Sequence, residues 1–310
     1  MNELLRALGN SLKELGNTFL ESFFGENKNN SLTASFGEAT KLLSTRNKGF
    51  CLDGKRSITL TQSRSNVLVV APSGKGKTQV SIYPFLLNFE GQSSLLINDV
   101  SGELAQTIPY LNSIGVATGI LDFGEKKGLY FNPLDGCKGN ITQIKKVAQT
   151  LMRASQGNNT KLDFWAISGA DTITLFIQFV MESEESEYQN LANIYRLILE
   201  YQGSPNTIES LIARKASIEV WAKFKSLAGN SENTRKSIVA SALAALSFIG
   251  DDPVLCDITS FTNINFQDFR ETPHALFVQV PVSDTSYYAP ILSLFFQEFY
   301  CLNLTLKLYF

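Results

Sequence analysis

Residues 71–78 read Ala-Pro-Ser-Gly-Lys-Gly-Lys-Thr. This run fits the phosphate-binding loop pattern G-x-x-x-x-G-K-[ST] at every position except the first, where alanine replaces glycine. Gly74 and Gly76 let the backbone curl so that its N–H groups point at a polyphosphate. An apolar, β-branched run precedes the loop at residues 66–71, and helical spacing follows at residues 78–89. We therefore expect a buried strand, a nucleotide-binding loop and a helix in succession, rather than a chance glycine–lysine turn.

Each position of this loop has an expected role. Lys77 is expected to contact the β- and γ-phosphates of ATP, and the Thr78 hydroxyl is expected to ligate Mg²⁺. The helix N-terminus near Thr78 adds the positive end of its dipole. The residues assigned to the nucleotide are Ser73, Gly74, Lys75, Gly76, Lys77 and Thr78.

Asp99 ends a second strand-like run, residues 94–99. Parallel sheets bind ligands outside the carboxyl ends of their strands, so Asp99 is expected at the same edge as the loop. There it would reach Mg²⁺ or its water, which makes Asp99 a candidate catalytic residue with Lys77 and a candidate metal ligand with Thr78. Helix capping is the alternative, because Asp99 or Ser101 precedes a helix expected near residue 102. The two roles are compatible, and both stay open.

The rest of the chain predicts an α/β fold with an insert. Further strand-like runs occur at residues 115–122 and 275–281, so strands alternate with helices as in a parallel sheet covered on both faces. Between residues 141 and 250 the apolar residues step at helical period, which predicts an all-helical insert of about five helices. A final helix is expected over residues 286–303.

We divide the chain into four parts. Residues 1–30 read as an amphipathic helix and a polar linker, with protein packing favoured over a membrane-surface role. Residues 31–140 and 251–310 are expected to form the two parts of a nucleotide-binding domain. Residues 141–250 are expected to form the all-α domain between them.

Composition excludes several classes of protein. Hydrophobic residues make up 44% and charged residues 18% of the chain, which excludes a disordered protein. The formal net charge of −2 provides no global positive field for nucleic acid, so any such contact needs a local patch or a channel built by several subunits. Four scattered cysteines and the single His274 exclude zinc ribbons and His-rich metal sites. No apolar run reaches the 18 or so residues of a transmembrane helix.

Three sequence blocks together resemble a known family. They are the loop at residues 71–78, the run Asn-Asp-Val-Ser-Gly-Glu-Leu at residues 98–104, and Tyr-Phe-Asn-Pro-Leu-Asp at residues 130–135. In this order they resemble the coupling proteins of conjugative type IV secretion systems, the TraG/TraD class, whose second block reads D-P-K-G-E-L. This chain departs from that block at Val100 and Ser101. Further matches lie at residues 163–165, 233–237 and 274–281.

The resemblance implies a RecA-like P-loop NTPase sheet interrupted by an all-α domain. Members of the family form homo-hexameric rings at the cytoplasmic face of the bacterial inner membrane. They use ATP and Mg²⁺, and ATP hydrolysis is linked to the movement of relaxase-bound single-stranded DNA into the secretion channel. The resemblance therefore implies an ATP-binding motor subunit with DNA, a relaxase and channel proteins as its partners.

One departure affects the expected chemistry. The family's Walker B acidic pair follows the helix that corresponds to residues 286–303, whereas here residues 304–310 read Leu-Thr-Leu-Lys-Leu-Tyr-Phe. We therefore expect a chain truncated before that pair, which binds ATP with little hydrolysis. The alternatives are a non-hydrolysing nucleotide-binding interaction module and an FtsK/HerA-like ring translocase, and the block at residues 131–135 argues against the latter.

Some other positions have simpler explanations. Asn132 and Asp135 are expected to form a turn around Pro133, with a place near the nucleotide as the alternative. Gln279 lies on an expected central strand and is able to point towards the site. Trp165 is expected to pack in a helical core, with stacking on single-stranded DNA as the alternative.

Overall fold

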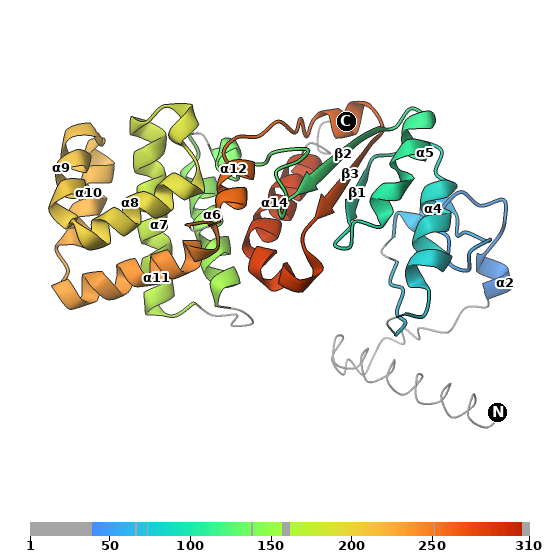
Figure 1. The fold of residues 1–310 in the computed structure, drawn as a ribbon, viewed down its shortest axis with the longest axis horizontal. Coiled ribbons are helices and arrows are strands. Elements are labelled where there is room, and N and C mark those ends of the chain that lie inside the picture. The colour runs from blue at the N-terminus through green and yellow to red at the C-terminus, as the bar shows by residue number, and fades with distance from the viewer. Residues whose placement is uncertain are drawn as a thin grey trace, which may run out of the picture.

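The computed structural model describes residues 39–305, except residues 66, 73, 138, 157–161 and 251 (Figure 1). The expected N-terminal helix and linker, Ser73 of the loop and residues 306–310 lie outside this described part. In Figure 1, helices α6 to α11 lie at one end of the molecule and the sheet lies in the middle, with α4 and α5 beyond it.

In the described part of the chain, the sheet contains three parallel strands in the order β1-β3-β2. They are β1 (Leu95–Asn98), β2 (Ala117–Asp122) and β3 (His274–Gln279). The predicted strands at residues 94–99, 115–122 and 275–281 are thereby confirmed. β3 is the last of these strands in sequence but lies in the centre, where it pairs with both neighbours.

Alternate side chains of β3 enter two separate apolar clusters. Leu276 and Val278 belong to the cluster that also contains buried residues of α14 (Thr285–Thr305). Ala275 and Phe277 face the other way, into the cluster of Leu86, Phe89, Leu104, Leu111 and Val116 from α4, α5 and their flanks. This alternation is the period of two of a strand buried on both faces. The α/β fold class with helices on both faces of a parallel sheet is confirmed.

The strand predicted at residues 66–71 is wrong. No strand among the described residues pairs with this run, and Leu68 and Val70 are 80% and 82% exposed. β-Branched residues favour a strand that is half-buried in a sheet, but a strand also needs a neighbouring strand to pair with, and composition does not determine that neighbour. Residues 67–71 therefore lead into the phosphate-binding loop without being part of the sheet.

Short helices cover the face of the sheet that Ala275 and Phe277 of β3 present. The π-helical turn η1 (Thr78–Ile82) continues into α4 (Tyr83–Leu87), with Pro84 in the first turn of α4. The 3-10 turn η2 (Leu104–Thr107) continues into α5 (Ile108–Ser113). The helix predicted at residues 78–89 and the one expected near residue 102 are thus both present. The short helices α2 (Ala39–Leu42) and α3 (Leu60–Ser63) precede them.

The described residues between 141 and 250 contain helices and no strand. The elements from residue 135 onward are η3 (Asp135–Cys137), α6 (Ile141–Ser155), α7 (Phe164–Ser183), η4 (Ser186–Tyr188), α8 (Leu191–Gly203), α9 (Pro205–Lys215), α10 (Ile218–Ala228) and α11 (Glu232–Gly250). Side chains of Asn140, Asp163, Asn190 and Ser217 cap the helices that follow them. Local polar residues therefore define where these helices begin.

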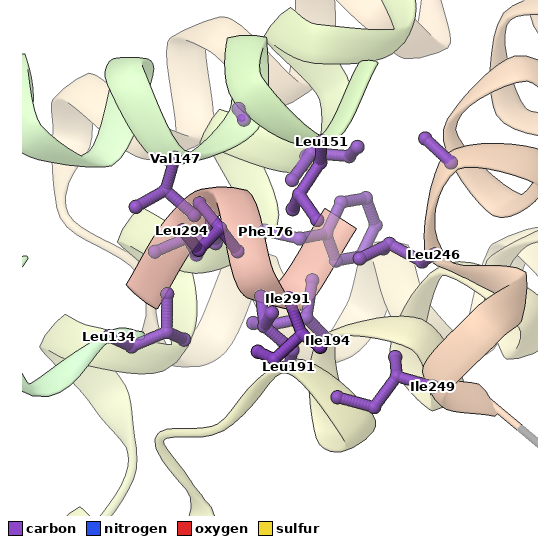
Figure 2. Close-up of a cluster of buried hydrophobic side chains, with 14 of the residues drawn as sticks. Leu134, Val147, Leu151, Phe176, Leu191, Ile194, Leu246, Ile249, Ile291 and Leu294 are labelled. Atoms are coloured by element: carbon purple, nitrogen blue, oxygen red, sulfur yellow. The ribbon is translucent and has the colours of Figure 1, made fainter. Parts of the chain in front are cut away.

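The helical part shares its hydrophobic core with one face of the sheet. After α11 the chain forms α12 (Pro253–Ile258), α13 (Asp268–Glu271), β3, η5 (Val282–Asp284) and α14. Figure 2 shows Ile291 and Leu294 of α14 among buried side chains of α6, α7, α8 and α11. α14 thus packs between the sheet and the helical part. The division into a nucleotide-binding domain and an all-α domain remains our proposal.

Contrary to the expectation from the sequence, α7 has the length and composition of a membrane-spanning helix. It is the one helix of the described residues that reaches this threshold, with a mean hydropathy of 1.4, and 67% of the apolar window is buried inside the protein. Its buried residues include Ile173, Phe176 and Val180, which lie at the centre of the shared core. At its start, by contrast, Trp165 is 42% exposed, so the expected core position of this tryptophan is wrong.

Candidate nucleotide-binding site

The two glycines of the phosphate-binding loop have the backbone conformation that the sequence predicted. Gly74 and Gly76 have φ angles of +73° and +79°, in the left-handed region that disfavours residues with a Cβ atom. The Lys75 N–H donates to the Pro72 carbonyl at 3.3 Å and closes a turn within the loop. Gly74 and Lys75 are exposed, so the curl faces solvent.

The Lys77 side chain folds back across this curl. Its ammonium group donates to the carbonyl oxygens of Ala71 at 2.7 Å and Pro72 at 3.0 Å. Lys77 directly precedes η1, and Thr78 is the first residue of that turn; both are half-buried. A cation, a helix N-terminus and a loop of positive-φ glycines thus lie together, and this is the donor set that a polyphosphate requires.

Asp99 is a buried helix cap. Its side chain is 2% exposed, and its Oδ1 accepts from the Leu104 N–H at 3.1 Å. Its Oδ2 accepts from the Ala105 N–H at 3.0 Å and from the Gln279 side-chain amide at 3.1 Å. The capping role left open by the sequence is therefore present. Metal ligation by Asp99 stays a prediction, and Mg²⁺ would compete with these three donors for the same oxygens.

Gln279 reaches Asp99 from the end of β3, 180 residues along the chain. Gly102 has a φ of +72°, and a Cβ atom there would lie 3.6 Å from the Gln279 side-chain nitrogen. The sequence left the direction of Gln279 open because this contact depends on β3 lying next to β1. The Asp99–Gln279 pair fixes the turn after β1 against the central strand.

Tyr83 connects the loop helix to the Asp99 turn. Its hydroxyl donates to the Glu103 carbonyl oxygen at 2.8 Å. Burial raises the pKa of Tyr83, and the negative charges of Glu103 and Asp99 raise it further. The structure therefore places α4, which continues the turn that follows Lys77, against the segment that Asp99 caps. The sequence analysis missed Tyr83, because nothing in the spacing of a tyrosine within a helix marks such a contact.

Comparison with known proteins decides the family. Residues 5–306 match the family described as "Type IV secretory system Conjugative DNA transfer". This chain belongs to the type IV secretory system conjugative DNA transfer family. The expected resemblance to the TraG/TraD class of coupling proteins is therefore confirmed. No curated protein matches the sequence.

Two solved structures share the fold of this conjugative DNA transfer chain. Both are forms of the bacterial conjugative coupling protein TrwBdeltaN70, each 14% identical to it in sequence. The trigonal form, in complex with sulphate, has a TM-score of 0.57 over 86% of this chain and 61% of that one. The unbound monoclinic form has a TM-score of 0.50 over 72% of this chain and 48% of that one. The RecA-like P-loop NTPase fold with an all-α region is thus shown, and the chain spans about three fifths of the first structure.

The block at residues 131–135 of this conjugative transfer protein has a structural role. The Asn132 side chain is buried, and its amide donates to the Gln189 carbonyl at 2.8 Å, between α7 and α8. Its carbonyl oxygen accepts from the Leu134 N–H at 3.0 Å, which forms the predicted turn around Pro133. The Asn132 N–H also donates to the Thr262 hydroxyl at 2.9 Å. Asn132 therefore joins the helical part to the segment that leads into β3.

Directly after this block, η3 lies against Glu298 of α14. A Cβ atom on Gly136 would lie 2.6 Å from a Glu298 carboxylate oxygen, so glycine permits this close approach. Burial raises the pKa of Glu298 to about 7, with a further contribution from Asp135. Burial also raises the pKa of the Cys137 thiol to about 12, and Glu298 and Asp135 add to that shift. The sequence analysis missed Glu298, which lies far from this block in the chain.

Proposed function

We propose that this chain binds Mg-ATP at residues 71–78 and is the motor subunit of a conjugative type IV secretion system. The observation that supports this most strongly is the position of Lys77 across a loop of two positive-φ glycines. In this proposal the chain links relaxase-bound single-stranded DNA to the secretion channel, as the family resemblance implies.

The residues present fit a magnesium nucleotide. Backbone N–H groups of Gly74 and Gly76 would hold the phosphates. The Lys75 N–H would exchange the Pro72 carbonyl, and Lys77 its two carbonyl partners, for phosphate oxygens. Thr78 would hold the metal ion, with Asp99 as a second candidate. When bound, ATP supplies the phosphoryl group whose transfer to water drives movement. The protein's own contribution is to bind and orient that group at the edge of the sheet.

A second candidate function is a nucleotide-binding interaction module that does not hydrolyse ATP. The hydrogen bonds of Asp99 favour it, because both carboxylate oxygens already accept from Leu104, Ala105 and Gln279. A carboxylate held in this way stabilises the turn after β1. It is not free to orient a water molecule, as phosphoryl transfer to water requires.

The proposed partners follow from the family and from the charge of the chain. A net charge of −2 gives one subunit little attraction for DNA, so a ring of several copies is the arrangement that we propose for DNA contact. We propose a homo-hexamer at the cytoplasmic face of the inner membrane, with a relaxase and channel proteins as partners.

Thermal unfolding with and without Mg-ATP tests the nucleotide site. Because a ligand that binds the folded state raises Tm, Mg-ATP should raise it for the wild-type chain and for Lys55→Ala. Lys55 is an exposed lysine in the segment that precedes the loop, so its removal controls for charge. Lys77→Ala should abolish the shift, and equal shifts in all three proteins would refute the site. Phosphate release with single-stranded DNA present then separates the two functions, since a motor gives Lys77-dependent turnover and the module does not.

A further inference from the structure

A groove along α7 has no role in the proposed nucleotide site. It lies in the helical part, which Figure 1 shows at the opposite end of the molecule from α4. Its volume is about 460 Å³, within the range of roughly 300–1,000 Å³ that is usual for ligand-binding clefts. Side chains of α6, α7, α10 and α11 line it, and the polar, charged and aromatic ones include Lys145, Phe164, Asp171, Gln178, Lys223 and Asn230.

The groove follows one face of α7. The residues that this helix contributes recur at steps of three and four, which is the spacing of a single helical face: Phe164, Ser168, Asp171, Leu175 and Gln178. From the first of them to the last, the helix rises by about 21 Å. Beneath the groove lie buried apolar side chains, and its rim is polar and exposed. A long groove of this kind suits an extended chain better than a compact small molecule.

An exposed aromatic ring lies at one end of the groove. Phe164 is 63% exposed, and its ring contacts the ring of Trp165 in a T-shaped arrangement with 5.1 Å between the centroids. The Asp163 side chain caps α7 by accepting from the Ala166 N–H at 2.8 Å, so the backbone that presents Phe164 is held in place. Residues 163–165 are a sequence block that the nucleotide site does not use. An exposed ring beside a groove is a surface on which a nucleobase stacks.

Two lysines line the groove, and their charges are not neutralised by an ion pair. Lys223 donates to the Gln178 side-chain oxygen at 2.8 Å, and this amide carries no charge. Lys145 is exposed, and it forms no hydrogen bond or ion pair with any described residue. Asp171 is the acidic residue among those that line the groove. Because it would repel a phosphate, we expect phosphates at the two lysines and bases beside Asp171.

The helices around the groove carry an excess of positive charge. α6, α7, α10 and α11 together contain seven basic and four acidic side chains, and α6 contains no acidic residue. The whole chain has a formal net charge of −2, so positive charge is concentrated in these helices. This is the local patch that contact with nucleic acid requires in a chain without a global positive field.

We propose that this groove binds single-stranded DNA, with a base stacked on Phe164 and backbone phosphates at Lys145 and Lys223. A positively charged groove with an aromatic side chain is the combination by which proteins bind single strands without reading their sequence. An amphipathic helix of a protein partner would need a continuous apolar surface, whereas the rim here is polar. The inference rests on the proposed function, which makes single-stranded DNA the transported molecule, and it adds the surface that contacts the strand.

Fluorescence anisotropy of a labelled oligothymidylate, titrated with the full chain without ATP, tests the groove. Phe164→Leu keeps an apolar side chain but loses the ring, and it should weaken binding about tenfold. Phe164→Tyr keeps the ring and should bind as the wild type does. Lys145→Gln and Lys223→Gln should each lower the slope of log affinity against log salt by about 0.7. Asp171→Asn removes a negative charge and should tighten binding.

Two control variants match these changes outside the groove. Phe261→Leu replaces a phenylalanine that is 49% exposed, and Lys55→Gln replaces an exposed lysine. Neither should change the affinity or its salt dependence. Thermal unfolding without DNA should give the same Tm for the groove variants as for the wild type, because the side chains of Lys145, Phe164 and Lys223 are exposed.

Wild-type affinity in Phe164→Leu, or an unchanged salt slope in both lysine variants, would overturn the proposal. Polyglutamate serves as a competitor that has charge but no bases. If it displaced the oligonucleotide as well as unlabelled oligothymidylate does, the groove would be a site for an acidic peptide, and the proposal would be wrong. A groove that fails this test leaves Mg-ATP binding at Lys77 untouched, and a failure of Mg-ATP to bind leaves groove-dependent DNA binding untouched, so the two failures are distinguishable.

Discussion

The ammonium group of Lys77 lies 2.7 Å from the carbonyl oxygen of Ala71, the first residue of the same loop. The backbone carbonyl groups of the loop therefore hold the Lys77 side chain in place in the ligand-free protein. Both groups are near the surface, and such a hydrogen bond contributes little to the stability of the fold.

Replacement of Lys77 is therefore expected to leave the ligand-free protein folded. Lys77→Ala should lower the free energy of unfolding by less than about 1 kcal/mol, because it removes only partly exposed hydrogen bonds. Urea denaturation of the ligand-free chain measures this value. A much larger loss would mean that the missing Mg-ATP response of this variant reports unfolding rather than a lost phosphate contact.

Asp99 is expected to matter for stability far more than Lys77 does. Asp99→Ala leaves the N–H groups of Leu104 and Ala105 and the Gln279 amide without an acceptor, which should cost about 2–4 kcal/mol. The control Ser101→Ala changes only a marginal contact, 3.5 Å from the Glu103 N–H, and should cost less than about 0.5 kcal/mol. Urea unfolding compares the two. If Asp99→Ala instead kept its stability and lost Mg-ATP binding, metal ligation rather than capping would be its main role.

Glu298 is expected to make stability depend on pH. Its pKa is about 7 in the fold against an ordinary value of 4.5, because it is buried and lies near Asp135. Between these values the folded chain keeps a proton that the unfolded chain has released, so stability falls as the pH rises from about 4.5 to 7. The expected fall is on the order of 2 kcal/mol. Lys146 and Cys137 also line the cavity beside Glu298, but Asp135 is the charge that raises its pKa.

Unfolding free energies at pH 5 and pH 8 check this dependence. Glu298→Gln should remove this part of the pH dependence and should be more stable than the wild type at pH 8. Glu185→Gln, which changes an exposed glutamate, should keep the wild-type profile. An unchanged profile in Glu298→Gln would show that another group causes the dependence.

Replacement of Asn132 by aspartate, which has nearly the same shape, is expected to lower the stability of the protein. Asn132→Asp replaces the amide donor with an oxygen that faces the Gln189 carbonyl, 2.8 Å away in the buried junction. This should destabilise the protein by about 2–4 kcal/mol. The Asn193 side chain also donates to a backbone carbonyl, that of Tyr188 at 3.1 Å, but this hydrogen bond is exposed to solvent. Asn193→Asp should therefore cost less than about 1 kcal/mol in the same urea experiment, and similar losses in both variants would argue against a special role for Asn132.

The elements that the sequence predicted correctly are those defined by local patterns. β1, β2 and β3 are short apolar runs, and α6, α7 and α11 show apolar residues at helical spacing, so their positions follow from neighbouring residues. The loop glycines also predicted their own positive φ angles. The run at residues 66–71 failed because its composition favours a strand, whereas a strand also needs a partner, and pairing is a property of the whole fold.

The contacts that the sequence could not predict join distant parts of the chain. Gln279 reaches Asp99 across 180 residues, and Asn132 reaches Thr262 across 130. The first of these contacts exists because β3 lies next to β1 in the sheet. Glu298 meets Gly136 for the same kind of reason, since α14 packs against the segment before α6. In each case the residue type was readable from the sequence, but its partner was not.

The central place of β3 has a consequence for how the chain folds during synthesis. Among the described residues β1 and β2 do not pair with each other, so neither has a partner strand until the ribosome has made His274–Gln279. The helices between β2 and β3 in sequence form mainly local contacts, which favour rapid folding. We therefore expect these helices to fold while β1 and β2 are still unpaired. Unpaired strands with exposed apolar side chains are prone to aggregate. The nascent chain should therefore depend on chaperones most strongly before β3 leaves the ribosome.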